Sequence, residues 1–125
     1  MGGGYNNVVL EVSSSIVGGF QNTISSLNCG ILGGSNNTTS ASNGAIIGGH
    51  HNNAGGQNSI ICGGDSNSTT TLNSIILGGK SASTSKTGEI AHANGAFSVA
   101  GDAQHSILIV RRITTDATAN TVLTL

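Results

Sequence analysis

The chain of 125 residues is long enough for one domain of ordinary size, but it lacks the side chains from which such domains are usually built. Aromatic residues make up 2% and charged residues 7% of the chain, whereas glycine occupies 20 positions and proline none. The formal net charge of -1, with only scattered Lys and Arg, excludes the basic surface that nucleic acids or anionic membranes would require.

Disorder and membrane insertion are also disfavoured by the composition. Disordered chains usually carry proline and net charge, whereas this chain has no proline and short β-branched runs that recur at a fixed interval. No apolar stretch approaches the roughly 20 residues of a membrane-spanning helix. Residues Met1–Tyr5 have neither the basic nor the apolar region of a secretory signal peptide. The sequence therefore predicts a soluble, folded chain.

A Gly-Gly pair recurs with a constant 15-residue period, without insertion or deletion, over the first two thirds of the chain. The pairs are Gly3-Gly4, Gly18-Gly19, Gly33-Gly34, Gly48-Gly49, Gly63-Gly64 and Gly78-Gly79. Isoleucine stands two positions before each later pair, at Ile16, Ile31, Ile46, Ile61 and Ile76. Asparagine stands three positions after the second glycine, at Asn7, Asn22, Asn37, Asn52 and Asn67. A second asparagine column comprises Asn28, Asn43, Asn58 and Asn73.

Each 15-residue unit fits one coil of a parallel β-solenoid. The unit is too short for a pair of helices, and no segment has apolar residues at helical spacing. It has room for two strands of about 4 to 5 residues, with Gly and Asn at the corners because these residues tolerate positive φ. Coils stacked ~4.8 Å apart would turn the isoleucines into an apolar ladder and the asparagines into hydrogen-bonded ladders. The predicted fold is an all-β parallel solenoid, or β-roll, over residues 1–100.

One coil holds little apolar material, and this scarcity predicts self-association. Apart from the isoleucine and the Val, Leu or Cys that follows it, the columns mix apolar with small and polar residues. Examples are the column Ser15, Gly30, Ala45, Ile60 and Ile75 and the column Val12, Leu27, Ser42, Gln57 and Leu72. Three chains wound around one axis could pool their apolar columns in a shared core. The sequence therefore predicts an intertwined homotrimer.

The repeat resembles the left-handed parallel β-roll of trimeric autotransporter adhesin heads and of phage tail fibres. The unit that carries the resemblance best is Asn73-Ser74-Ile75-Ile76-Leu77-Gly78-Gly79. In that family the repeats often contain Asn-Ser-x-Ala-Ile-Gly, and three chains share the roll. Here Gly-Gly replaces a single glycine, and the repeat is one residue longer than the commonest adhesin form. Both differences favour the phage-fibre type.

The last part of the chain predicts a second module over residues 101–125, a β-strand connector or cap. Ala93-Asn94 is expected at the place of the next Gly-Gly pair, and the apolar run Ile107–Val110 follows. The segments Gly88–Phe97, Gly101–Ser106 and Arg111–Asp116 resemble the region that follows the roll in many tail fibres. That resemblance implies the start of a trimeric β-rich domain, of a kind sometimes linked with a self-cleaving intramolecular chaperone.

The expected function is that of a structural, non-enzymatic fibre protein of a virus or phage, a tail-fibre or spike shaft that supports host attachment. Its expected location is the virion or an extracellular surface. Its expected partners are two further copies of itself, other fibre or virion proteins and a host receptor. A trimeric surface adhesin is the main alternative. An ice-binding solenoid is a weaker one, because Thr38-Thr39 and Thr69–Thr71 are not repeated in every coil.

No catalytic residue or cofactor is predicted, since the acidic residues are not spaced as paired catalytic carboxylates. His50-His51 is the candidate metal site, because a trimer could bring three copies of one ring to its axis. Surface turn residues are the favoured interpretation of this pair. Cys29 and Cys62 lie about two coils, or roughly 9 Å, apart, which is too far for a disulfide. Cys62 is predicted to be a small core residue.

Overall fold

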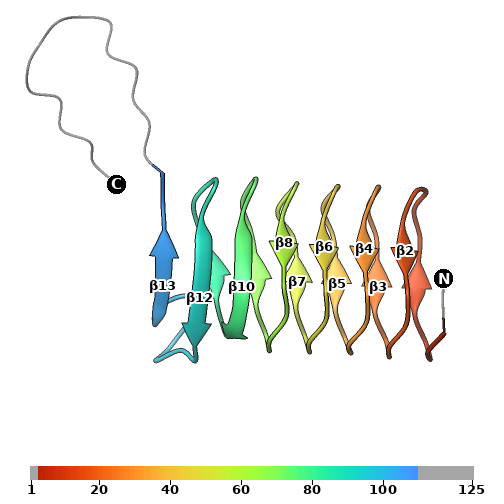
Figure 1. The fold of residues 1–125 in the computed structure, drawn as a ribbon, viewed down its shortest axis with the longest axis horizontal. Coiled ribbons are helices and arrows are strands. Elements are labelled where there is room, and N and C mark those ends of the chain that lie inside the picture. Colours follow the sequence, from red (N-terminus) through yellow and green to blue (C-terminus); the bar gives the residue numbers. More distant parts are fainter. Residues whose placement is uncertain (1–2, 110–125) are drawn as a thin grey trace, which may run out of the picture.

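The computed structural model describes residues 3–109, which form a solenoid whose coils stack along one axis (Figure 1). Within this range each coil gives one short strand to each of two sheets. The strands from successive coils pair in parallel, one repeat period apart, as in Val8 with Thr23 and Ile16 with Ile31. Residues 3–109 contain no helix, and hence none long and apolar enough to cross a membrane. The predicted all-β parallel solenoid of 15-residue coils is confirmed.

The first sheet runs along one side of the solenoid and the second sheet along the other. The first sheet consists of β1 (Val8–Val9), β3 (Thr23–Ile24), β5 (Thr38–Thr39), β7 (Asn53–Ala54), β9 (Ser68–Thr69) and β11 (Ser83–Thr84). The second sheet consists of β2 (Ser15–Ile16), β4 (Gly30–Ile31), β6 (Ala45–Ile46), β8 (Ile60–Ile61), β10 (Ile75–Lys80), β12 (Ile90–Asn94) and β13 (Gln104–Ile107).

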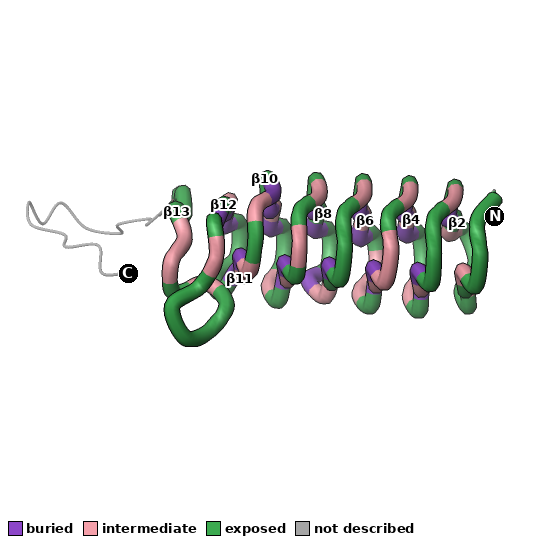
Figure 2. The backbone as a smooth tube through the Cα atoms, turned by 90° about the horizontal axis from the view of Figure 1, so that it is seen from below, coloured by how far each residue is buried: buried purple, intermediate pink, exposed green. Residues whose placement is uncertain are grey.

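The core is a narrow column of side chains between the two sheets. Along the backbone, the buried positions recur from coil to coil (Figure 2). Side chains alternate between the two faces of a strand, so each short strand sends one side chain inward. From the second sheet the inward residues are Ile16, Ile31, Ile46, Ile61, Ile76 and Ala91, all of them buried. From the first sheet they are Val9, Ile24, Thr39, Ala54, Thr69 and Thr84. The sequence did not predict this second column, in which threonine replaces apolar residues.

Each chain encloses its own isoleucine column. The five isoleucines at 16, 31, 46, 61 and 76 are 0% exposed in a single chain. The two sheets of one solenoid therefore supply the cover that three chains were expected to supply together. These isoleucines therefore need no shared core between chains, contrary to the expectation from the scarcity of apolar residues. The homotrimer itself stays a prediction.

The first asparagine column forms a buried ladder along the solenoid. Asn37 illustrates it: its Oδ1 accepts a hydrogen bond from the backbone N–H of Asn52 at 3.0 Å. Its Nδ2 donates to the carbonyl oxygens of Gly33 at 3.2 Å and Gly49 at 3.0 Å. Asn22, Asn52 and Asn67 repeat this pattern. Each asparagine thus ties the backbone of its own coil to that of the next.

The corners of the coils use residues that tolerate a left-handed backbone. The second glycine of each pair has positive φ, for example 92° at Gly49. The second asparagine column also lies in this region, with φ of 57° at Asn28 and 60° at Asn43. In that column Nδ2 of Asn43 donates a hydrogen bond to Oδ1 of Asn58 at 2.8 Å, so exposed side chains also link neighbouring corners.

The repeat changes at its C-terminal end. A register shift after Ile76 shortens the step between paired positions by one residue, so His92 pairs with Gly78 and Ala93 with Gly79. His92-Ala93 therefore replaces the Gly-Gly pair, and the prediction of Ala93-Asn94 at this place was wrong by one residue. β13 then pairs antiparallel with β12. Residues 110–125 lie outside the described residues, so the cap module over 101–125 stays a prediction.

Candidate functional site

The outer face of the second sheet carries an apolar stripe that recurs once in each of five successive coils. The stripe consists of the residue after each inward isoleucine, namely Val17, Leu32, Ile47, Cys62 and Leu77. Val17, Leu32, Ile47 and Leu77 are 58%, 56%, 50% and 57% exposed. Ile60, Ile75 and Ile90 of the same sheet lie beside it and are partly exposed. Apolar residues in such a row mark surfaces that contact other molecules.

The outer face of the first sheet is polar by contrast. Its outward residues after Val8 are Thr23, Thr38, Asn53, Ser68 and Ser83. The two faces of the solenoid therefore differ in chemistry over the same length, although both follow the same 15-residue repeat. Of the two sheets, the second therefore has the more apolar outer face.

Cys62 belongs to the apolar stripe and is exposed, whereas Cys29 is buried. The prediction that Cys62 is a core residue was wrong. It follows the inward Ile61 directly, and strand alternation turns the next side chain outward. Cys29 instead lies inside the coil, with its Sγ within 3.2 Å of the Ala41 carbonyl oxygen.

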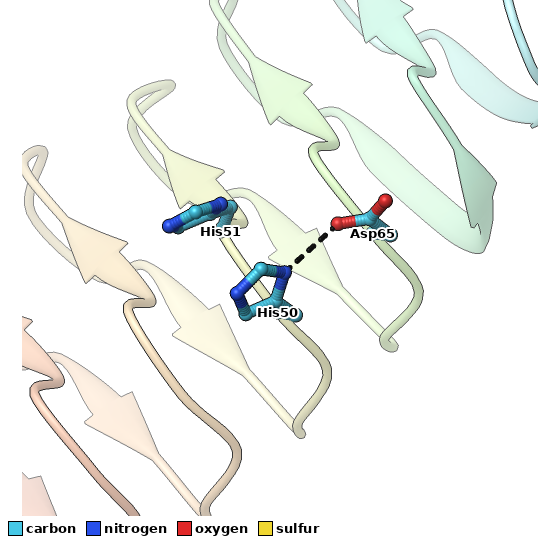
Figure 3. A group of neighbouring side chains, drawn as sticks. All are labelled: His50, His51 and Asp65. Atoms are coloured by element: carbon cyan, nitrogen blue, oxygen red, sulfur yellow. Dashed lines mark hydrogen bonds and ion pairs between the residues drawn. The ribbon is translucent and has the colours of Figure 1, made fainter.

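His50 and His51 lie at a corner of the solenoid beside Asp65 of the next coil (Figure 3). Nδ1 of His50 is 3.1 Å from Oδ1 of Asp65, and the two imidazole rings lie with their centroids 3.9 Å apart. Nζ of Lys80, one coil further, is 3.6 Å from the other oxygen of Asp65. The hydrogen bond from His50 is the main cause that lowers the pKa of Asp65 below its usual value, and Ser66 and Lys80 lower it further.

Asp65 was not predicted as a partner of the histidines, although the repeat contained the signal. It stands one full period after His50, so stacking places the two side chains in adjacent coils. All four histidines of the chain in fact occur in two pairs, because His92 lies opposite His105 on the paired strands β12 and β13.

Glu89 is a buried carboxylate at the C-terminal end of the coils, and the sequence did not single it out. Its Oε2 accepts hydrogen bonds from the backbone N–H groups of Ser85 at 2.7 Å and Lys86 at 3.1 Å. Its Oε1 accepts hydrogen bonds from Nε2 of Gln104 at 3.1 Å and from the hydroxyl of Ser106. Glu89 thus joins the last full coil to β13.

Gln104 covers the edge of β11 with its side-chain amide. Its Oε1 accepts from the backbone N–H of Ser83, and its Nε2 donates to the Ser83 carbonyl oxygen, both at 2.8 Å. The amide thus makes the two hydrogen bonds that a further parallel strand would make. The amide thus covers the last parallel strand of the first sheet, and β13 covers the last parallel strand of the second sheet and becomes its edge strand at this end of the described coils.

The Glu89 carboxylate should make this end of the solenoid sensitive to acid. Burial raises the pKa of Glu89, but the hydrogen bonds from Ser106 and from the Ser85 and Lys86 N–H groups lower it more, to a value below the usual 4.5. Since the pKa of Glu89 is lowered in the folded state, the ionised carboxylate stabilises the fold. This stabilisation is fully present above about pH 4.5 and is lost as the pH falls through the folded-state pKa.

We therefore expect hydrogen exchange at the Ser85 and Lys86 amides to accelerate as the pH is lowered below about 4.5, after correction for the intrinsic pH dependence of exchange. In the Glu89→Gln variant, the same two amides should exchange faster than in the wild type at neutral pH. Their corrected exchange rates should no longer increase as the pH is lowered. Equal corrected protection in both proteins across the titration would show that the carboxylate does not hold this end.

Comparisons with protein-family models, with curated proteins and with solved structures found no match for this chain.

Proposed function

We propose that this protein is a structural, non-enzymatic shaft segment whose copies associate side by side into a fibre, most simply a homotrimer. The single observation that carries the proposal is the apolar stripe along the outer face of the second sheet. The stripe runs parallel to the solenoid axis over five coils, which is about 20 Å at the spacing of stacked strands. A rod with one apolar side buries that side best against copies of itself, because they share its repeat and its length.

The direction of the stripe, along the solenoid axis, favours parallel association of the copies. Copies that pack in parallel with their stripes facing one axis form a closed cyclic assembly, which leaves no apolar side exposed. Apolar burial contributes about 25 cal/mol for each Å² removed from water, so every added coil strengthens the contact by a similar amount. The number of three chains comes from the resemblance to trimeric β-rolls and not from the stripe itself.

The place of such a shaft would be a virion tail fibre or spike, or another extracellular surface, where it supports attachment to a host. Other fibre or virion proteins and a host receptor are the partners that this role requires. In the alternative role, a trimeric surface adhesin, the polar outer face of the first sheet would bind the ligand. Ice binding has less support, since Thr23 and Thr38 on that face are followed by Asn53 and Ser68.

Light scattering on the full chain tests the association. We expect a native mass of about three times the 12.3 kDa of one chain. Ile47→Lys places a charge on the apolar stripe and should yield 12.3 kDa monomers with an unchanged far-UV circular dichroism spectrum. Asn53→Lys, which places the same charge on the exposed outer face of the first sheet, is the matched control and should keep the wild-type mass. A monomeric wild type, or equal masses for the two variants, would overturn the proposal.

Cys62 offers a second readout of the same contact, because it lies within the stripe and is exposed. A short bis-maleimide added to the native protein should link two chains through Cys62, giving a dimer band on a denaturing gel. Cys62→Ser should abolish the band. Loss of the band in Ile47→Lys, with retained reactivity toward a single maleimide, would show that linking depends on the apolar contact.

A further inference from the structure

We propose that His50, His51 and Asp65 bind one divalent transition-metal ion, with Zn²⁺ as the best-fitting ion. These three side chains come from two adjacent coils, and one ligand atom from each can be chosen so that all lie within 4.8 Å of one another. The site differs from the axial metal site considered from the sequence, because it uses residues of one chain and depends on no partner.

The separation of two of the three donor atoms, those of His50 and Asp65, already suits a small metal ion. Zinc binds imidazole nitrogen and carboxylate oxygen at ~2.0–2.2 Å, so two ligands of a tetrahedral site lie about 3.3 Å apart. Nδ1 of His50 and Oδ1 of Asp65 are 3.1 Å apart. An ion between them would therefore replace their hydrogen bond with little movement of either side chain. His51 is exposed and can complete the site by rotating its ring.

The backbone of the solenoid fixes the relative positions of the three residues from which these side chains extend. His50 lies in a ladder of β-bridges between Ser35 and Asp65, so its distance from the Asp65 backbone is set by coil stacking. His51 has a left-handed backbone with φ of 53°, and its ring lies against that of His50. In an extended strand, adjacent side chains point to opposite faces. The turn thus brings together two imidazoles that a strand would separate.

The ligand set selects among metal ions. Two imidazoles and one carboxylate suit zinc, copper and nickel better than calcium or magnesium, which prefer oxygen ligands alone. Three protein ligands with water in the fourth position are a common zinc arrangement. Lys80 acts against binding, because its ammonium group is 3.6 Å from Oδ2 of Asp65 and repels a cation. It contacts the oxygen that does not face His50, so Oδ1 stays available to the metal.

Calorimetric titration of the full chain with ZnCl₂ at pH 7.5 tests the proposal. The parent for all measurements is the triple variant Cys62→Ser, His92→Asn and His105→Asn, which removes the exposed thiol and the other histidine pair as competing ligands. We expect one Zn²⁺ per chain. His51→Asn in this parent should weaken binding at least about tenfold. Asparagine occupies the same left-handed corner at Asn6 and Asn36, so the fold is kept.

Two further variants separate metal binding from a general change at the corner. Asp65→Ser copies Ser35 of the same column and should weaken binding as His51→Asn does. Lys80→Met removes the competing charge and should tighten binding by a few-fold. Failure of the parent to bind Zn²⁺, or equal binding by the parent, His51→Asn and Asp65→Ser, would overturn the proposal.

Discussion

Replacing Gly49 with alanine should lower the free energy of unfolding by at least about 4 kcal/mol, enough to unfold much of the chain at room temperature. A Cβ atom at this position would overlap the carbonyl oxygen of Gly64 and lie 2.6 Å from Nδ2 of Asn52. The backbone there also has φ of 92°, which an alanine adopts only with strain. Since the overlapping atom belongs to the backbone of the next coil, relief requires the coils to move apart.

Gly48→Ala is the matched control for this substitution. A Cβ atom at Gly48 meets no atom within 4 Å, and its φ lies outside the left-handed region. Alanine should there be neutral or should stabilise the protein by up to about 1 kcal/mol, because it restricts the unfolded chain. Denaturant unfolding followed by circular dichroism measures both variants. Similar unfolding midpoints for Gly48→Ala and Gly49→Ala would show that close stacking of the second glycines does not determine stability.

Asn37→Ala should destabilise the solenoid by about 2–4 kcal/mol. The substitution removes the acceptor for the backbone N–H of Asn52, a buried residue, and so leaves a buried donor unpaired. It also removes the donor to the Gly33 and Gly49 carbonyl oxygens and leaves a small cavity. The cost should therefore exceed that of one ordinary hydrogen bond.

Asn53→Ser provides the comparison for Asn37→Ala. Asn53 is an exposed residue of the first sheet, and Ser68 already holds the same place in the next coil. Its replacement should change the free energy of unfolding by less than about 0.5 kcal/mol. If the two substitutions had equal effects in denaturant unfolding, the buried ladder would contribute no more to stability than a surface asparagine.

The repeat made the architecture predictable, because stacking at a fixed period needs only the period and the residues that can occupy a tight corner. Gly49 shows this well: its recurrence once in every period predicted both its turn and its place above Gly64. The first asparagine column was harder to interpret. Asn37 was expected at a corner or in a side-chain ladder, whereas it is buried and bonds mainly to backbone groups of the next coil.

Other features were not predicted because the residue type alone does not show whether a side chain points into the core or toward solvent. Thr39 and Thr69 fill the core in the same column as Ile24, but threonine also occurs on exposed strand faces, so the column did not stand out. Cys62 was assigned to the core by its small, apolar character, yet its position next to Ile61 turns it outward. Strand alternation was the stronger guide in that case.

The candidate site was partly predictable for the same reason. His50 and His51 attracted attention as neighbours in sequence, and adding one period to His50 leads directly to Asp65. Glu89 is different, because its partners Gln104 and Ser106 lie in a segment that does not follow the repeat. No periodicity could have placed that segment over the last coil.

The stacking of the coils also determines how the rod bears load. The backbone hydrogen bonds of both sheets run along the long axis, whereas the covalent chain circles around it (Figure 1). Tension applied at the two ends therefore acts on the coils in series and detaches them one after another from an end. A force perpendicular to the long axis is instead resisted by the covalent bonds of the peptide chain. The same geometry thus yields a body that resists crushing and gives way stepwise when it is stretched.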